Sequence, residues 1–410
     1  MLKEGGLKMV EKSIIDVERH HQEKVLKQHQ QQYFKTSTHL SITPLQHNFH
    51  NNLHNNSIST MAIPETFKAY RRTTGAHPLT IVPTTETTPK NLGPKDVLIK
   101  IHSVSLNYRD VAMLSGVYPA NVVEKGIPAS DAAAEVAAIG SAVQKFKVGD
   151  RVSPNFFVNF LTGEEEEPVQ GLGGDVEGVL AEYRVFDENL LVGLPEYLSW
   201  DEASTIACAG VTAWSSVDGL KGLSPEKDYA LLEGTGGVSI FSLLLLVDAG
   251  IKTIITSSSD AKIAQLQKLS PLVIGINYKT TTDIAAEVQR ITNGRGAKIV
   301  LNNIGPASIP SNIDSLATYG SVKIVGFLGG FTGDWNPSKI LELLWKRANL
   351  QGIAVGSKRD FEELNAHLEK RKISLAPLLD RVFTLDETKE AFDHMIAGRH
   401  VGKIIIKVAE

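Results

Sequence analysis

The stretch LLEGTGGVSIF, residues 231–241, joins a short apolar segment to a longer apolar run through a glycine-rich turn. Glycine is needed wherever a Cβ would block a tight turn or the approach of a phosphate. Backbone N–H groups and a helix dipole at such a junction can meet a pyrophosphate. Ser239 stands where the usual G-x-G-x-x-G pattern has its third glycine, and it is small enough for close helix–strand packing. The loop residues placed to contact a dinucleotide are Gly234, Gly236, Gly237 and Val238.

Short apolar segments alternate with helical segments on both sides of this loop. Such alternation is typical of a parallel, doubly wound Rossmann sheet, with the glycine loop at its first strand–helix junction. The expected strands are 228–234, 253–259, 273–278, 297–305, 322–330 and 350–356. The expected helices are 237–250, 260–269, 285–294, 312–320 and 339–349.

The chain before the Rossmann pattern has a different organisation. Residues 67–73, 79–87 and 96–107 alternate apolar and polar side chains in the manner of half-buried strands. We expect a β-rich, barrel-like domain here, with the charged stretch 163–175 as a solvated surface loop. The last segment, 357–410, is expected to return to this domain, and residues 378–410 predict a strand, a helix and a strand within it. The fold class is therefore α/β, with a barrel-like domain interrupted by an inserted doubly wound sheet.

The predicted boundaries are 63–195 for the first part of the barrel-like domain and 196–356 for the Rossmann domain. Residues 1–62 hold seven of the twelve histidines in runs such as HNFHNNLHNN, which indicates a disordered, low-complexity tail. Its His residues could bind a metal weakly, although solvated sequence is the simpler interpretation. A transit peptide is disfavoured by five acidic residues among the first 23.

Composition excludes several classes of partner. The net charge of −4 gives no electrostatic reason to expect nucleic acid or an acidic membrane surface. The apolar run 240–247 is far shorter than the ~20 residues of a membrane span. Cys208 is the only cysteine, which excludes intrachain disulfides and fits a reducing, cytoplasmic setting.

The segment TSSSDAK, residues 256–262, bears on the choice of dinucleotide. An NAD site usually has an acidic side chain at the end of its second strand, bonded to the ribose diol. Here hydroxyls and one ammonium group could meet a 2′-phosphate instead, so NADP(H) is favoured over NAD(H). Alternatively, the serines only cap the next helix, or Asp260 is the ribose ligand. The candidate phosphate contacts are Ser257, Ser258, Ser259 and Lys262.

Several motifs together resemble the medium-chain dehydrogenase/reductase superfamily. They are SLNYRDVAMLSGVYP, VGDRV, CAGVTAW, LLEGTGGVSIF, TSSSDAK, INY and HVGKIII, in this order between about 65 and 410. The pattern is most similar to zinc-free, quinone-oxidoreductase-like and fungal alcohol-dehydrogenase-like members. The resemblance implies a GroES-like catalytic domain formed by both ends of the chain, with the Rossmann domain between them.

The resemblance also bears on metal binding. Zinc-dependent members hold catalytic zinc with a Cys, a His-Glu pair and a second Cys, and zinc needs about three such ligands. This sequence has Asn107 at the first position and Ser130-Asp131 at the pair; only Cys208 matches. We therefore expect no bound metal. Cys208 is then a packed residue near the cofactor, although a reactive thiol stays open.

The resemblance places Asn107 and Tyr118 on the nicotinamide and substrate side, as candidate catalytic residues. Tyr108 and Arg109 either line the mouth of the site or lie on the surface, and Asp110 holds the loop by hydrogen bonding. Four further residues are implied around the nicotinamide, namely Thr212, Gly326, Phe327 and Leu328. Two more are implied at the adenosine or phosphate end, Tyr278 and Lys403.

The expected function is zinc-independent hydride transfer from NADPH to a small molecule of the quinone, enone or aldehyde class. A pathway enoyl reductase would share every residue named above. A zinc-type alcohol dehydrogenase and a non-catalytic NADPH-binding protein are two competing hypotheses. A homodimer is the expected oligomeric state.

Overall fold

The computed structural model describes residues 63–409. The predicted low-complexity tail, residues 1–62, lies outside the described residues and stays a prediction. Among residues 63–409, no helix has both the length and the apolar character needed to cross a membrane.

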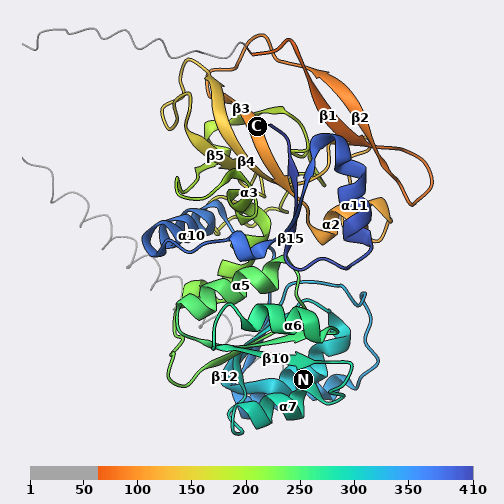
Figure 1. The fold of residues 1–410 in the computed structure, drawn as a ribbon, viewed down its shortest axis with the longest axis vertical. Helices are drawn as coiled ribbons and strands as arrows, with labels where there is room; N and C mark the ends of the chain where they lie inside the picture. Colours follow the sequence, from red (N-terminus) through yellow and green to blue (C-terminus); the bar gives the residue numbers. More distant parts are fainter. Residues whose placement is uncertain (1–62, 410) are drawn as a thin grey trace, which may run out of the picture. The chain divides into compact units, whose positions relative to one another are not determined.

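The Rossmann pattern forms a six-stranded sheet in which every neighbouring pair is parallel. The strand order is β10-β9-β8-β11-β12-β13, so the order reverses between β8 and β11. Open sheets of this kind bind ligands at the carboxyl ends of the strands beside this reversal. In Figure 1 this sheet and its helices form the green to light-blue part. The strands are β8 (Tyr229–Leu232), β9 (Lys252–Ser257), β10 (Val273–Asn277), β11 (Ala297–Asn302), β12 (Leu316–Ile324) and β13 (Asn349–Gly352).

The helices of this domain connect successive strands. They are α5 (Gly237–Asp248), α6 (Asp260–Gln267), α7 (Ile284–Ile291), α8 (Ile309–Ser315) and α9 (Glu342–Lys346). Along α5 the residues from Ser239 to Leu246 are buried, which explains why its sequence is apolar on every side. The predicted helix 312–320 was wrong in its second half. Helix α8 ends at Ser315 because Leu316 already pairs with Ala297 of β11, and this tertiary pairing overrides the local helical pattern.

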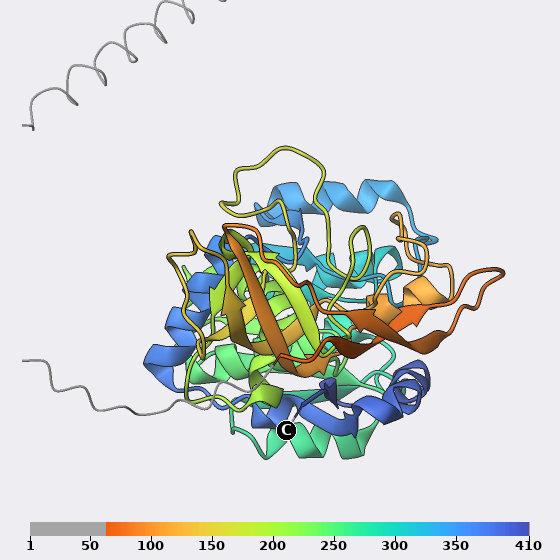
Figure 2. The same ribbon diagram turned by 90° about the horizontal axis from the view of Figure 1, so that it is seen from above.

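The β-rich domain is built on a seven-stranded sheet with the path β14-β15-β3-β4-β5-β7, and β6 also pairs with β3. These strands are β3 (Asp96–Ser105), β4 (Asp131–Ile139), β5 (Arg151–Pro154), β6 (Tyr183–Asp187), β7 (Leu191–Gly193), β14 (Leu379–Thr384) and β15 (Lys403–Lys407). A separate antiparallel pair, β1 (Thr66–Arg72) and β2 (Ile81–Thr87), extends to one side of this sheet in Figures 1 and 2.

Strand β15 pairs antiparallel with β3, with Ile405 opposite Ser105. Residues from both ends of the described chain therefore share one sheet, and the six-stranded sheet is an insertion between them. The predicted fold class, a GroES-like domain with an inserted Rossmann sheet, is confirmed. The exact domain boundaries stay a prediction.

Further helices and turns complete the two domains. The helices are α2 (Tyr108–Leu114), α3 (Trp200–Ala203), the π-helix η2 (Ile206–Gly210), α4 (Val211–Ser216), α10 (Lys358–Arg371) and α11 (Thr388–Ile396). The 3₁₀ turns are η1 (Glu188–Leu190), η3 (Asp218–Leu220), η4 (Pro306–Ser308), η5 (Pro337–Leu341), η6 (Ala376–Leu378) and η7 (Leu385–Glu387).

The charged stretch 163–175 is only partly the solvated loop that its composition predicts. Most side chains between 163 and 170 are exposed, and Glu165 accepts backbone N–H groups such as that of Gly163 at 2.9 Å. Residues 171–174 are buried instead. The prediction was wrong for this half because its glycines let the backbone pack against the guanidinium of Arg109, whose Nη2 would lie 2.4 Å from a Cβ at Gly174.

Candidate active site

The glycine-rich loop has the geometry of a phosphate cradle. Gly234 has a φ of +76°, a left-handed conformation that favours glycine. Gly236 is the N-cap of α5 and no side chain caps the helix there. A Cβ at either position would meet no atom within 4 Å. The first N–H groups of α5 therefore adjoin open space, which fits the pyrophosphate of a dinucleotide.

Ser239 ties the start of α5 to the end of β8. Its hydroxyl donates to the Glu233 carbonyl at 2.9 Å and accepts from Asn303 Nδ2 at 2.9 Å. This confirms the expectation that a small residue at this position permits close helix–strand packing. The Glu233 carboxylate accepts from Asn312 Nδ2 at 2.6 Å, and burial raises the pKa of this carboxyl. Glu233 and its amide partners were missed by sequence reasoning, although the glutamate lies inside the quoted loop motif.

Lys403 connects the glycine loop to the catalytic domain. It is 2% exposed, and its Nζ donates to Asn107 Oδ1 at 2.7 Å and to Asp131 Oδ2 at 3.4 Å. Its stem runs beside the first turn of α5, where a Cβ on Gly237 would lie 2.6 Å from Lys403 Cδ. The preceding residue, Gly402, donates its N–H to the Thr235 carbonyl at 2.9 Å. Lys403 was expected at the adenosine or phosphate end; in this structure its ammonium group lies beside Asn107.

Asn107 caps α2 and is held on both sides. Its backbone N–H donates to Asp110 Oδ2 at 2.8 Å, which confirms the expected role of Asp110 in holding the loop. Because Asn107 Oδ1 accepts from Lys403, its Nδ2 is the group left to donate. Nδ2 has a long contact of 3.4 Å to Ser130 Oγ, so a donor is available to a better acceptor.

Cys208 is a packed residue. It lies in the π-helix η2 and packs with Phe156 and Phe157 in a small apolar cluster. Burial raises the pKa of its thiol to about 12. Thr212, expected near the nicotinamide, is buried one turn later and donates its hydroxyl to the Cys208 carbonyl at 2.6 Å.

These side chains do not fit a catalytic zinc site. Zinc sites are built mainly from cysteine and histidine ligands, and Cys208 is the only cysteine of the chain. The amide oxygen of Asn107 and the carboxylate of Asp131 already accept from a lysine cation. Over residues 63–409, no group of three or more His, Cys, Asp or Glu side chains is arranged to hold a metal ion.

Tyr118 and its neighbours meet the Rossmann domain through Phe327. The ring centroid of Phe327 lies 5.8 Å from that of Tyr108 and 6.3 Å from that of Tyr118. Tyr108 is 43% exposed, whereas Arg109 is 8% exposed, so the surface interpretation was wrong for Arg109. Arg109 Nε donates to Tyr118 Oη at 3.2 Å. The loop after α2 thus faces the carboxyl end of β12.

The loop after β12 passes close to the backbone of Asn303 at a glycine. A Cβ on Gly326 would lie 2.7 Å from the Asn303 carbonyl oxygen, so only glycine fits without a shift. Phe327 stacks on Phe331 at 4.9 Å, and Leu328 is exposed. Two aromatic rings therefore line the Rossmann side of the contact with Tyr118.

The end of β9 agrees with one of the interpretations offered by the sequence, the capping of α6. Ser259 is the N-cap of α6, with its hydroxyl accepting from the Lys262 N–H, as the capping interpretation states. Ser257 is buried at the strand end, while Ser258 is half-buried.

Lys262 Nζ donates to the His400 carbonyl at 2.9 Å, and burial lowers the pKa of this lysine. Two neighbours, Asp260 and Tyr278, are exposed, and Asp260 accepts from Asn277 Nδ2 at 2.8 Å.

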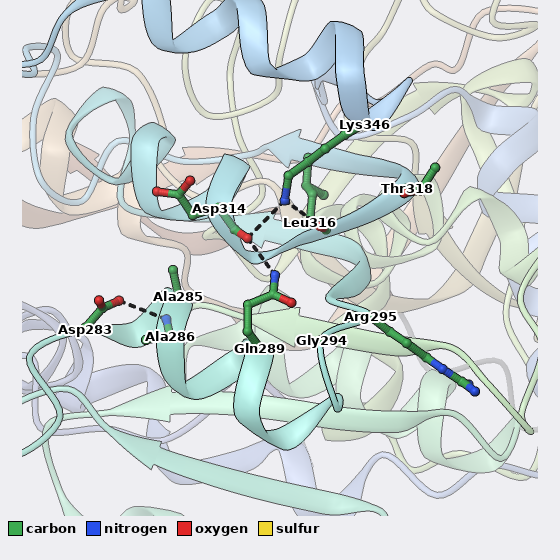
Figure 3. Close-up of a pocket in the computed structure, with 10 residues that line it drawn as sticks. All are labelled: Asp283, Ala285, Ala286, Gln289, Gly294, Arg295, Asp314, Leu316, Thr318 and Lys346. Atoms are coloured by element: carbon green, nitrogen blue, oxygen red, sulfur yellow. Dashed lines mark hydrogen bonds between the residues drawn. The ribbon is translucent and has the colours of Figure 1, made fainter.

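Two hollows lie outside the glycine loop. One of about 600 Å³ lies between α7, α8 and α9 and is drawn in Figure 3. Lys346 Nζ and Gln289 Nε2 both donate to the Asp314 carbonyl there, and Arg295 points away from the others, so it is an ordinary polar depression. The other, about 380 Å³, is lined by Tyr118 and by Arg72, and therefore adjoins the candidate active site.

Comparison with known proteins agrees with this architecture. Residues 93–196 match the family model "Alcohol dehydrogenase GroES-like domain", and residues 237–370 match "Zinc-binding dehydrogenase". A zinc-type alcohol dehydrogenase-like protein of Schizosaccharomyces pombe is 36% identical over 325 residues, covering 78% of this chain and 93% of the relative. A quinone oxidoreductase of Pseudomonas aeruginosa is 26% identical over 328 residues, covering 78% of this chain and 93% of that protein. The crystal structure of a putative alcohol dehydrogenase from Sinorhizobium meliloti has a TM-score of 0.78 and 31% identity, covering 85% of this chain and all of that one.

A GroES-like domain joined to a glycine-looped Rossmann sheet defines an oxidoreductase that uses a nicotinamide dinucleotide. More particularly, the chain belongs to the medium-chain dehydrogenase/reductase superfamily. The predicted family and enzyme class are therefore confirmed.

Proposed function

We propose that this chain is a zinc-independent, NADP(H)-dependent reductase of small molecules with an activated double bond or carbonyl, such as quinones, enones and aldehydes. The observation that carries the proposal is the Lys403 ammonium group, held 2.7 Å from Asn107 Oδ1 and 3.4 Å from Asp131 Oδ2. The Lys403 ammonium group therefore occupies the space between the Asn107 and Asp131 side chains, which a metal ion at this site would need as ligands. Without a Lewis acid, catalysis depends on hydrogen-bond donors aimed at the acceptor oxygen.

Asn107 and Tyr118 supply those donors in this proposal. Lys403 holds the oxygen of the Asn107 amide, which leaves its N–H groups to donate. Tyr118 Oη accepts from Arg109 Nε, which leaves its own O–H to donate. When bound, the reduced nicotinamide would supply the hydride. The two side chains would orient the acceptor group and stabilise the negative charge that develops on it.

NADP(H) is proposed over NAD(H) because β9 ends in Ser257 and no carboxylate stands at that position. The nearest acidic group, Asp260, is bonded to Asn277. Lys262 lies in the first turn of α6, and its ammonium group, bonded to the His400 carbonyl, could add positive charge to a 2′-phosphate site.

The cofactor proposal is tested by Ser257→Asp, which would set a carboxylate against a 2′-phosphate. We expect wild-type protein to bind NADPH more tightly than NADH, and the variant to lose NADPH affinity much more than NADH affinity. Fluorescence titration of both cofactors measures this, with the exposed and distant Thr318→Asp as the charge control. A wild-type preference for NADH would contradict the proposal and favour Asp260 as the ribose ligand.

The chemical proposal is tested by NADPH oxidation with a panel of quinones, enones and aldehydes. Tyr118→Phe should lower the turnover of an enone on the order of 10²-fold, the value of one well-placed donor, with little change in NADPH affinity. Treatment with a strong zinc chelator should leave wild-type turnover unchanged. Loss of activity on chelation, restored by zinc, would instead support a zinc-type alcohol dehydrogenase.

We also propose a homodimer in a cytoplasmic setting. The dimer is supported by exposed apolar side chains on η5 and α9, which precede β13 in the chain; β13 is one of the two outer strands of the six-stranded sheet. They are Ile340, Leu341, Leu344 and Trp345, of which Trp345 is 84% exposed. Large exposed apolar patches of this kind mark interaction surfaces.

A further inference from the structure

Arg109 is a buried guanidinium group without a carboxylate partner among residues 63–409. Its Nη1 donates to the Leu172 carbonyl at 2.7 Å and its Nε to Tyr118 Oη at 3.2 Å. The ring of Phe156 lies 4.8 Å from Cζ, and the ring of Tyr118 lies 5.1 Å from it. Nη2 has no hydrogen-bond partner in the described part of the chain, and it is not one of the fully enclosed polar atoms there. This nitrogen therefore keeps unused N–H donors, and it lies beside the backbone of Gly174, where a Cβ would be 2.4 Å from it.

The buried charges around Arg109 do not balance. Three buried cations, Arg72, Arg109 and Lys403, face two buried carboxylates, Asp110 and Asp131, which leaves one positive charge. These groups act on one another electrostatically. Lys403 is paired with Asp131, and the guanidinium of Arg72 donates only to backbone carbonyls. Another carboxylate that acts on Arg72, Glu177, is already paired with Arg71 at 2.9 Å. Burying an unbalanced charge is costly, so an anionic ligand would stabilise this group.

The free donors of Arg109 and Tyr118 point to one ligand. The phenolic oxygen of Tyr118 accepts from Arg109 Nε, so the Tyr118 O–H remains free to donate. Nη2 belongs to the same planar guanidinium group as Nε and is the second free donor. Two such donors match the two oxygens of a carboxylate, since charge-assisted pairs of this geometry are strong and directional. Tyr118 also adjoins Phe327 at the carboxyl end of β12. The donors therefore lie on the cofactor side of the catalytic domain.

We infer that Arg109 and Tyr118 form a receptor for a carboxylate carried by the substrate, so that the preferred substrates are unsaturated or oxo acids rather than neutral quinones. This inference rests on the proposed reductase function and narrows its substrate class. The carboxylate would accept from Arg109 Nη2 and from the Tyr118 hydroxyl. For these acids the Tyr118 hydroxyl is engaged by the carboxylate, and the Asn107 amide alone donates to the acceptor group. The acceptor double bond or carbonyl would lie beside it, toward Asn107.

The test compares one acid with its neutral ester. trans-3-Benzoylacrylate and its methyl ester carry the same enone, and its reduction consumes one NADPH and one proton. We expect wild-type kcat/KM to favour the acid by roughly 10- to 150-fold, the value of one hydrogen bond to a charged group. Arg109→Gln should abolish most of this preference, and Arg109→Lys, which keeps the charge but loses the planar fork, should keep part of it. The exposed Arg295→Gln is the matched control and should leave the preference intact.

Two results would overturn the inference while leaving the reductase proposal in place. One is equal turnover of acid and ester by wild-type protein. The other is an Arg109→Gln variant that prefers the acid as strongly as wild-type protein does. If neither compound oxidises NADPH, the reductase proposal fails for enones, and binding decides the inference. Calorimetry with the saturated analogue 3-benzoylpropionate and its methyl ester should then show at least a tenfold preference for the acid, and equal binding would overturn it. Should Arg109→Gln not fold, Gly174→Ala serves instead. Its Cβ would lie 2.4 Å from Nη2 and displace the guanidinium without removing the charge, so the preference should fall there too.

Discussion

Lys403 joins three parts of the molecule through one side chain. Its ammonium group bonds Asn107 and Asp131 of the catalytic domain, and its stem packs against Gly237 of the Rossmann domain. A buried ion pair adds little net stability, but removal of one partner leaves the other charge unpaired at a large cost. The residue therefore couples the integrity of the fold to the geometry of the candidate catalytic amide.

We predict that Lys403→Met lowers the free energy of unfolding by about 3–5 kcal/mol, because Asp131 is left buried without its cation. Urea unfolding monitored by tryptophan fluorescence measures this. The double variant Lys403→Met/Asp131→Asn removes both charges and should regain much of the loss. The control Lys407→Met, on an exposed position of the same strand, should change little. A loss in the double variant as large as in the single one would contradict the pairing.

Cys208 should be unreactive in the folded protein. Burial raises the pKa of its thiol from about 9 to about 12, so the folded state holds the proton more tightly than the unfolded chain. At pH 8 the thiolate fraction falls roughly 1,000-fold on folding, and labelling by iodoacetamide should slow at least as much. Because folding raises the pKa of this thiol, its contribution to the free energy of unfolding is fully present below pH 9 and is lost as the pH rises toward 12. Mass spectrometry of native and urea-unfolded protein measures the labelling, and equal rates in both would show an accessible thiolate.

At the scale of elements, the first turn of α5 performs two separate tasks. Gly236 leaves open space over the helix N-terminus, whereas Gly237 leaves room for the Lys403 stem. Two adjacent glycines of one motif are thus required for different reasons. One concerns the ligand and the other concerns the packing of the two domains.

We predict opposite outcomes for alanine at these two glycines. Gly237→Ala should lower the melting temperature, because its Cβ would lie 2.6 Å from a lysine stem that is anchored at both ends. Gly236→Ala should leave the melting temperature nearly unchanged and weaken NADPH binding, since its Cβ would project into the space of the pyrophosphate. Thermal unfolding and cofactor titration of both variants separate the effects. A stable Gly237→Ala protein would show that Lys403 can move aside.

At the scale of the whole molecule, one edge strand of each sheet, β13 and β14, can be compared by the apolar side chains exposed on or near it. Strand β13 lies at one end of the parallel sheet, and η5 and α9, which precede it in the chain, carry large exposed apolar side chains. Strand β14 ends the sheet of the catalytic domain and carries the exposed Val382. Exposed edges invite pairing with another chain unless they are protected.

We predict that Leu344→Glu/Trp345→Glu converts a dimer to a monomer, because two charges would be buried in the apolar contact. Light scattering after size-exclusion chromatography measures the mass. The matched control Val382→Glu, on the other edge strand, should leave the dimer intact. A wild-type monomer at micromolar concentration would contradict the proposed assembly.

The amino-acid sequence by itself determined the order of domains, the parallel Rossmann sheet and the phosphate loop. These depend on local patterns, namely strand and helix periodicity and glycines at a strand–helix junction. Its error at the predicted helix 312–320 arose where a pairing with Ala297 set the boundary.

Only the tertiary structure decided the composition of the candidate active site. Lys403 and Asn107 are 296 residues apart, and their contact depends on β15 pairing with β3. The burial of Arg109 depends on backbone from residues 171–174, which composition alone marks as a surface loop. Such contacts carry no periodic signal, because they are made between side chains that only the packing of two sheets and their loops brings together.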